Sequence, residues 1–192
     1  MTRHPELNEA ALTPEQQEVF DAIAAGPRGI VEGPLRVWVQ SPGLAATAQA
    51  LGQYARYDSV LSHHLSELAI LVTARYWSSG FEWTIHAPIA LTAGIPDWAM
   101  TAIAKAQRVV FDDPEKQAVF DFAVELHRDK NVSDATYAAA EQALGVQACV
   151  DLVGVCGYYT LISMTINVFD VPDGDGQALP ALSMKPANYF RN

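Results

Sequence analysis

Basic residues are scarce in this chain of 192 residues, which has 12 Lys and Arg against 22 Asp and Glu and a formal net charge of −10. A protein that binds nucleic acid needs a basic face to neutralise phosphates, and a protein that docks on an anionic membrane needs one too. The composition argues against both classes, so we expect neither nucleic acid nor membrane as a partner.

Long hydrophobic runs and cysteines are also few. We expect no apolar run near the roughly 18 residues of a membrane span, and the polar residues 1–9 lack a signal-peptide core, which favours the cytoplasm. The two cysteines are Cys149 and Cys156. On a straight helix they would lie about 10 Å apart, too far for a disulfide, and two such cysteines do not make a zinc site. We predict two buried thiols.

The apolar periodicity is helical, and no segment shows convincing strand alternation. Thr13 as N-cap, Pro14 at the first position and Gly26 after the last turn delimit one helix. Further helices are predicted over residues 42–56, 61–78, 79–93, 96–109, 114–128, 133–145 and 146–168. The sequence thus predicts an all-α bundle of roughly seven helices in a single domain, residues 1–169, followed by an extended tail rich in Pro, Gly and Asp, residues 170–192.

Two of these segments carry most of the apolar content. Residues 68–74 are apolar on nearly every face apart from Thr73, which predicts a central buried helix. The 146–168 segment is almost free of charge after Asp151. We expect one of its stripes to face the core: Val150, Val153, Gly157, Leu161 and Met164. Other faces would also need cover: Leu152, Val155, Tyr159 and Ile166. This favours a homo-oligomer.

Three ionisable residues are candidates for catalysis. Glu67 borders the most apolar helical stretch, either exposed beside His63 or partly buried with a raised pKa. Glu82 and His86 are spaced i,i+4 and share a helix face, as in a proton relay, half of a metal site or a surface pair. Ser79 and Glu82 also fit a capping box, so the role of Glu82 stays open between cap and catalyst.

An aromatic cluster surrounds these residues and includes Tyr76, Trp77, Phe81 and Trp83, with Arg75 beside it. Such clusters are commonly core, but coincidence with ionisable residues favours a pocket. We take these five residues together with Ser79 as candidates for substrate binding.

The segment ELAILVTARYWSSGFEWTIHAPIALTAG, residues 67–94, resembles the carboxymuconolactone decarboxylase family, which includes the AhpD-like alkylhydroperoxidases. The resemblance extends to GPLRVWVQSP, residues 33–42, and to ALGVQACVDLVGVCGYYTLISMTINVFDVP, residues 143–172. The peroxidase branch has a glutamate, a Cys-x-x-Cys beginning twelve residues later and a histidine at nineteen. Counted from Glu67, these positions hold Ser79, Glu82 and His86, so the Cys-x-x-Cys is absent. A second histidine of the peroxidases falls on Phe81.

The resemblance implies an AhpD-like bundle, a homotrimer or homohexamer, and a cofactor-free lyase of decarboxylase or isomerase type acting on a small carboxylated lactone or cyclic acid. His86 would be the general acid, Glu67 would hold its tautomer, and Arg75 would bind the substrate carboxylate. One alternative is a peroxidase-related antioxidant protein, which the missing Cys-x-x-Cys disfavours. Another is a metal-dependent enzyme with ligands among His63 or His64, Glu67, Glu82 and His86. We expect no cofactor and no metal.

Overall fold

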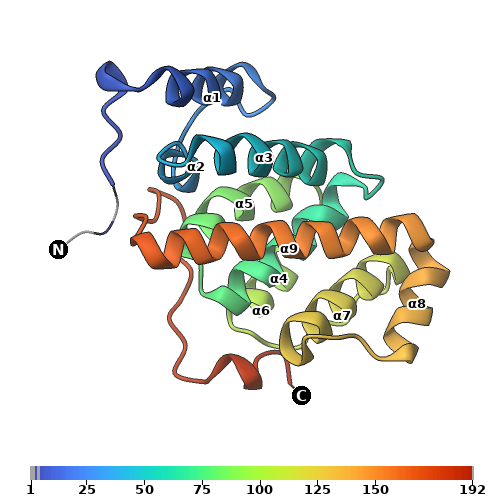
Figure 1. Ribbon diagram of the computed structural model, residues 1–192. Helices are drawn as coiled ribbons and strands as arrows, with labels where there is room; N and C mark the ends of the chain where they lie inside the picture. The colour runs from blue at the N-terminus through green and yellow to red at the C-terminus, as the bar shows by residue number, and fades with distance from the viewer. Residues whose placement is uncertain (1–2, 4, 192) are drawn as a thin grey trace.

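The computed structural model describes residue 3 and residues 5–191, and it confirms the predicted all-α architecture (Figure 1). The described residues contain nine α-helices and no strand. Their bounds are α1 Pro14–Ala25, α2 Pro34–Trp38, α3 Pro42–Gln53, α4 His63–Trp77, α5 Gly80–Thr92, α6 Asp97–Ala104, α7 Pro114–Asp129, α8 Asp134–Leu144 and α9 Val146–Phe169. A π-helical turn, Tyr54–Asp58, follows α3.

The helix ends follow the local sequence signals in part. Thr13 and Gln16 form the N-terminal capping box of α1, and Gly26 ends that helix as predicted. Helix α6 is shorter than the predicted 96–109, because the backbone enters the left-handed region at Ala106, with φ of +53°. The prediction also missed α2, whose five residues are too few to show a helical period.

Helix α4 is the centre of the bundle, as its composition predicted. Every residue from Leu65 to Tyr76 is buried, and the helix packs against α5, α6, α7 and α9. Helices α1 to α3 lie above α9 and helices α7 and α8 below it in the view of Figure 1. This arrangement brings α4 and α5 side by side and packs α4 against α9, which α2 and α3 also contact.

The predicted core stripe of α9 is wrong. Leu152, Val155 and Tyr159 face the core and are at most 1% exposed, whereas Val150 and Val153 are 65% and 49% exposed. Because both faces of the helix are apolar, sequence periodicity does not distinguish the buried face from the exposed one. The exposed face forms a stripe along the helix, which we call the α9 stripe: Val146, Val150, Val153, Met164 and Val168.

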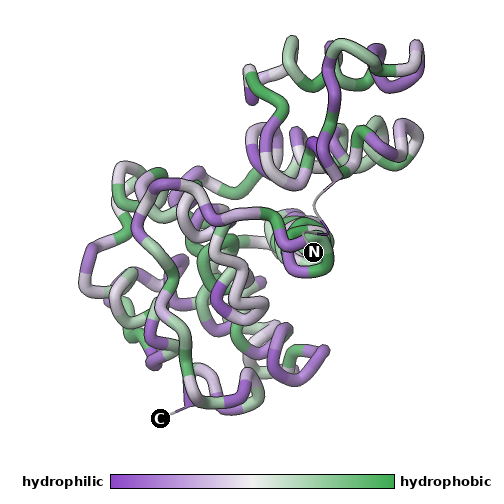
Figure 2. Tube along the Cα trace, turned by 90° about the vertical axis from the view of Figure 1, so that its left-hand side faces the viewer, coloured by the Kyte–Doolittle hydropathy of each residue, from purple (hydrophilic) through white to green (hydrophobic). Residues whose placement is uncertain are grey.

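Helix α9 also corrects the expectation that no segment is long and apolar enough for a membrane span. It has 24 residues and a mean hydropathy of 1.5 over its most apolar window, half of which is buried. Figure 2 looks nearly along this helix, with the other helices around it. A long, mostly buried core helix can have the same length and composition, so the feature is weak evidence for a membrane.

The tail after α9 runs down the outside of the bundle and returns to the core at its end (Figure 1). Tyr189 and Phe190 are 3% and 2% exposed, and the Phe190 N–H donates to the Ala106 carbonyl at 2.7 Å. The segment is extended apart from one 3-10 turn, Pro186–Asn188. Buried aromatic side chains therefore anchor the tail to its own chain.

Candidate active site

His86 lies between two carboxylates, one from α4 and one from its own helix. Its Nδ1 is 2.8 Å from Glu67 Oε2, and its Nε2 is 3.3 Å from Glu82 Oε2. Glu67 is completely buried, and His86 and Glu82 are 2% and 4% exposed. The structure thus brings together the three residues that the sequence singled out as catalytic candidates.

A two-residue corner between α4 and α5 produces this arrangement. Ser78 adopts the left-handed conformation with φ of +50°, and the Ser79 N–H donates to the Ala74 carbonyl at 2.9 Å. The chain therefore reverses at once, and α5 packs back against α4. The i,i+4 spacing then sets Glu82 and His86 on the face of α5 that meets Glu67.

The capping alternative for Glu82 does not hold. Ser79 occupies the N-cap position of α5, but its side chain makes no capping hydrogen bond, and its Oγ is buried without a partner. The carboxylate of Glu82 faces the His86 ring instead. Glu82 is therefore part of the histidine environment.

The environment of His86 favours the imidazolium form. Burial lowers the pKa of this ring, but the charges of Glu67 and Glu82 and the hydrogen bond to Glu67 outweigh burial, so the pKa is raised above 6.5. Both ring nitrogens of an imidazolium are donors, and here each faces a carboxylate oxygen. The ring can therefore give up a proton and be protonated again through a neighbouring carboxyl group.

Unsatisfied polar atoms surround the ring. Glu67 Oε1 and the Tyr159 hydroxyl are buried without a hydrogen-bond partner, and Glu82 Oε2 lies 3.3 Å from His86 Nε2 in an ion pair without hydrogen-bond geometry. The Tyr159 ring packs edge-on against His86 at a centroid distance of 5.0 Å. Burial raises the pKa of Tyr159 well above 10, so its hydroxyl is a neutral donor. Buried polar groups are usually paired, and two of these three residues, Glu82 and Tyr159, line a cavity.

A cavity of about 270 Å³ opens on His86, Glu82 and Tyr159. Its volume suits a small monocyclic compound rather than a large cofactor. Most of its other lining is apolar: Ile30, Pro34, Leu35, Phe81, Ile85, Ile89 and Ile162. Four further polar or aromatic residues complete the lining: Arg28, Glu32, Arg56 and Tyr57.

Of the six predicted substrate-binding residues, only Phe81 lines this cavity. Gly33 makes room for it, because a Cβ there would lie 2.2 Å from the Phe81 ring. The other five lie elsewhere: Arg75, Tyr76, Trp77, Ser79 and Trp83. Trp83 and Ser79 are buried, and Trp77 donates its indole N–H to Thr160 Oγ1 at 3.2 Å. Tyr76 packs on His127 and the end of the tail.

Arg75 has a structural environment in this fold. Its guanidinium donates to the carbonyls of Ala104 and Pro180 at 3.1 and 2.8 Å and to Ser78 Oγ at 2.7 Å. It also stacks on the ring of Tyr189. These contacts join α4 to the tail, away from the cavity that His86 lines.

Sequence reasoning missed the two arginines at the cavity. Arg28 lies in the Pro- and Gly-rich loop after α1, and Arg56 lies in the π-helical turn after α3. Neither is near His86 in the sequence, and neither belongs to a motif. Long-range packing alone brings them to the site, so no local signal could have identified them.

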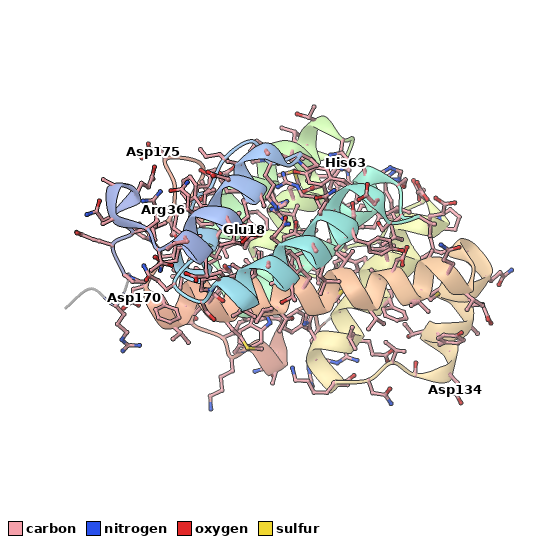
Figure 3. The ribbon with its side chains drawn as sticks, turned by 45° about the horizontal axis from the view of Figure 1, so that its top comes forward. Glu18, Arg36, His63, Asp134, Asp170 and Asp175 are labelled. Carbon is pink, nitrogen blue, oxygen red and sulfur yellow. The ribbon has the colours of Figure 1, made fainter. Side chains whose placement is uncertain are left out.

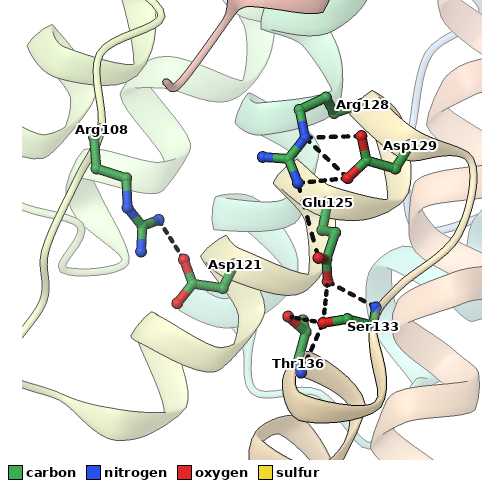
Figure 4. Close-up of polar contacts among 7 residues, drawn as sticks. All are labelled: Arg108, Asp121, Glu125, Arg128, Asp129, Ser133 and Thr136. Atoms are coloured by element: carbon green, nitrogen blue, oxygen red, sulfur yellow. Dashed lines mark hydrogen bonds and ion pairs between the residues drawn. The ribbon is translucent and has the colours of Figure 1, made fainter. Parts of the chain in front are cut away.

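A larger hollow of about 670 Å³ lies on another face and is lined mainly by charged residues. Figure 4 shows that five of its six charged residues pair with one another: Arg108 with Asp121, and Arg128 with Asp129 and Glu125. Paired surface charges have little left to offer a ligand. The cavity at His86 is therefore the stronger candidate site.

The two cysteines are free and buried, as predicted. Burial raises the pKa of Cys149, and it raises the pKa of Cys156 to about 12. A thiol peroxidase needs a thiolate near neutral pH, which these environments suppress. Neither cysteine lines the cavity at His86.

Of the residues suggested as metal ligands, Glu67, Glu82 and His86 lie together, whereas His63 and His64 are not among their contacts. His63 is exposed at the edge of the molecule (Figure 3), and His64 Nδ1 lies 3.3 Å from Ser62 Oγ. In the part of the chain that the structure describes, no group of three or more His, Cys, Asp or Glu side chains is arranged to hold a metal ion.

No protein-family model and no curated protein sequence matches this chain. Solved structures do match it. An AhpD-core, peroxidase-related protein from Ralstonia eutropha JMP134 has a TM-score of 0.72 at 15% identity, over 91% of this chain and 93% of that one. A peroxidase-related protein from Silicibacter sp. TM1040 has a TM-score of 0.70 at 14% identity, over 89% and 90%.

A third similar structure is the debrominase Bmp8, in a cysteine-to-alanine variant bound to 2,3,4-tribromopyrrole. Its TM-score is 0.71 at 12% identity, over 91% of this chain and 92% of that one. The similarity establishes an AhpD-like helical fold for this chain. The resemblance drawn from residues 67–94 is thereby confirmed at the level of the fold.

Proposed function

We propose that this protein is a cofactor-free enzyme that performs acid–base chemistry, of decarboxylase or isomerase type, on a small carboxylated lactone or cyclic acid. The observation that carries the proposal is His86, held between Glu67 and Glu82 at the wall of a small cavity. The fold supports it, because one protein with this fold binds a small planar ring, 2,3,4-tribromopyrrole. The raised pKa of two buried thiols disfavours the peroxidase alternative.

In a decarboxylation, the bond between the ring carbon and its carboxyl group breaks, and carbon dioxide leaves. The electron pair stays on the ring as a dienolate, which His86 stabilises by hydrogen bonding and then protonates at carbon. Glu67 keeps the imidazole oriented through its 2.8 Å contact at Nδ1. Glu82 lies at Nε2 and returns a proton that comes from solvent. An isomerisation uses the same groups to remove and replace a proton.

Carbon dioxide release from γ-carboxymuconolactone tests this proposal. We expect release by the wild type and loss of at least about 100-fold in His86→Ala, the range that general acid catalysis contributes. His63→Ala is the matched control, because His63 is exposed and outside the cavity. Equal activity in His86→Ala and the wild type would refute the assignment of His86. No release by the folded wild type would refute this decarboxylation, and a panel of lactones and ring acids would then test isomerisation.

A further inference from the structure

Two arginines share the wall of the cavity with His86 but have no acidic partner. Arg28 and Arg56 both line the cavity, and among the described residues neither forms an ion pair. Among the described residues, the one hydrogen bond that either side chain makes runs from Arg28 Nη2 to the Tyr158 hydroxyl. Glu32 also lines the cavity, but it is exposed and pairs with neither arginine. Two guanidinium groups therefore have donors to offer inside a partly enclosed space.

The position of Arg28 is built into the fold. Its Nη2 donates to the hydroxyl of Tyr158 at 3.1 Å, and Tyr158 is buried against Trp38 and Tyr159. Gly52 leaves the space for this pair, since a Cβ there would lie 2.1 Å from the Tyr158 hydroxyl and 2.6 Å from Arg28 Nη2. Such support holds a charged group in place before a ligand binds.

Arg56 approaches the cavity from a different segment. Its guanidinium carbon lies 5.2 Å from the centre of the Tyr57 ring, which also lines the cavity. The charges of Arg56 and Arg28 both act on the hydroxyl of Tyr159, as do those of Glu82 and Glu67. The two arginines and His86 with Glu82 therefore face the same cavity.

We propose that Arg28 and Arg56 bind a carboxylate of the substrate that the reaction retains. A guanidinium is always charged and offers two parallel N–H donors, which match a carboxylate. If the arginines held the departing carboxylate, they would stabilise the ground state and slow the loss of carbon dioxide. The departing group lies instead at His86, beside the apolar wall. The proposal rests on the function proposed above and specifies its substrate class: a ring acid with two carboxylates when the reaction is a decarboxylation.

Equilibrium binding of benzoate and of benzamide tests the arginines without any turnover. The two compounds share shape and differ in charge. We expect the wild type to prefer benzoate, and we expect Arg56→Gln and Arg28→Gln each to weaken benzoate binding by at least about tenfold with little effect on benzamide. Arg3→Gln, which removes the same charge from an exposed site, is the control. Arg28→Lys should recover part of the binding, because it restores the charge without the planar fork.

Equal benzoate binding by the wild type and Arg56→Gln would overturn the proposal, as would a wild type that binds benzamide as well as benzoate. Arg56 keeps the test decisive if loss of the Tyr158 contact unfolds the Arg28 variants. His86→Ala separates this proposal from the proposed function, since it should abolish turnover and retain the preference for benzoate. Preference without turnover in the wild type would support the arginine site and refute the decarboxylation. Turnover by the wild type together with an unchanged KM in Arg56→Gln would support the decarboxylation and refute the arginine site.

Discussion

Glu67→Gln tests the relay most directly, because it keeps the size of the side chain and removes its charge. The Glu67 charge is the largest of the effects that raise the pKa of His86, and burial opposes it. With Gln at this position the raising effect of the charge is lost, the lowering effect of burial remains, and the pKa of His86 falls. A hydrogen bond to a charged group contributes about 1.5–3 kcal/mol, so losing the charge at the 2.8 Å contact should lower kcat by about 10- to 100-fold.

The pKa of His86 can be measured by NMR titration of its ring, independently of any substrate. We expect a lower value in Glu67→Gln than in the wild type, and a smaller decrease in Glu82→Gln, whose contact with the ring is longer at 3.3 Å. A general acid works in its protonated form. The activity of Glu67→Gln should therefore be lost at a lower pH than that of the wild type as pH rises.

The raised pKa of His86 should also make the free energy of unfolding depend on pH. A folded-state pKa above 6.5 contributes stability that is fully present below pH 6.5 and is lost as pH rises through the raised value. The free energy of unfolding, measured by urea denaturation, should therefore fall less between pH 6 and pH 9 in Glu67→Gln than in the wild type. An unchanged or increased His86 pKa in this variant, with the fold intact, would refute the reasoning.

Three further results are expected. His127, whose pKa burial lowers to about 4, should withdraw about 3 kcal/mol of stability as pH falls from about 6.5 to 4, and His127→Gln should remove that dependence in urea denaturation. Peroxide consumption with a dithiol reductant should stay at background in the wild type, and a fast reaction abolished by Cys149→Ala or Cys156→Ala would contradict the thiol assignment. We also propose that the α9 stripe contacts a second copy of this chain, so Val150→Glu should lower the mass measured by light scattering while an exposed polar change such as Glu115→Gln does not.

The sequence predicted which three residues meet at His86 from the spacing of Glu82 and His86 and, for Glu67, from the family resemblance. The i,i+4 spacing of Glu82 and His86 fixes a shared face without any knowledge of the fold. Glu67 lies on the adjacent helix across a corner of only two residues, so few arrangements are available to the pair. A different pattern predicted α4 as the central helix. Residues 68–74 are apolar on nearly every face, and a helix of that kind must be covered on all sides.

The buried face of α9 could not be predicted in this way. When both faces of a helix are apolar, its period carries no information about which face meets the core, and only the packing partners decide. Helices α2, α3, α4, α7 and α8 all contact α9. They select the face with Leu152 and Tyr159 and leave Val150 and Val153 exposed.

The two kinds of arginine show where local reasoning ends. Arg75 is close to the aromatic cluster in sequence, yet its guanidinium donates to carbonyls of Ala104 and Pro180 and joins the tail to the core. Arg28 is 58 positions before His86 in the sequence and reaches the cavity only because Tyr158 and Gly52 fix it there. Both Nη atoms of Arg75 donate to protein oxygens and hold structure together, whereas among the described residues Arg28 donates through one Nη atom only and Arg56 through neither, which leaves donors for a ligand at the cavity. Hydrogen-bond partners, more than sequence distance from His86, thus separate a structural arginine from a binding one.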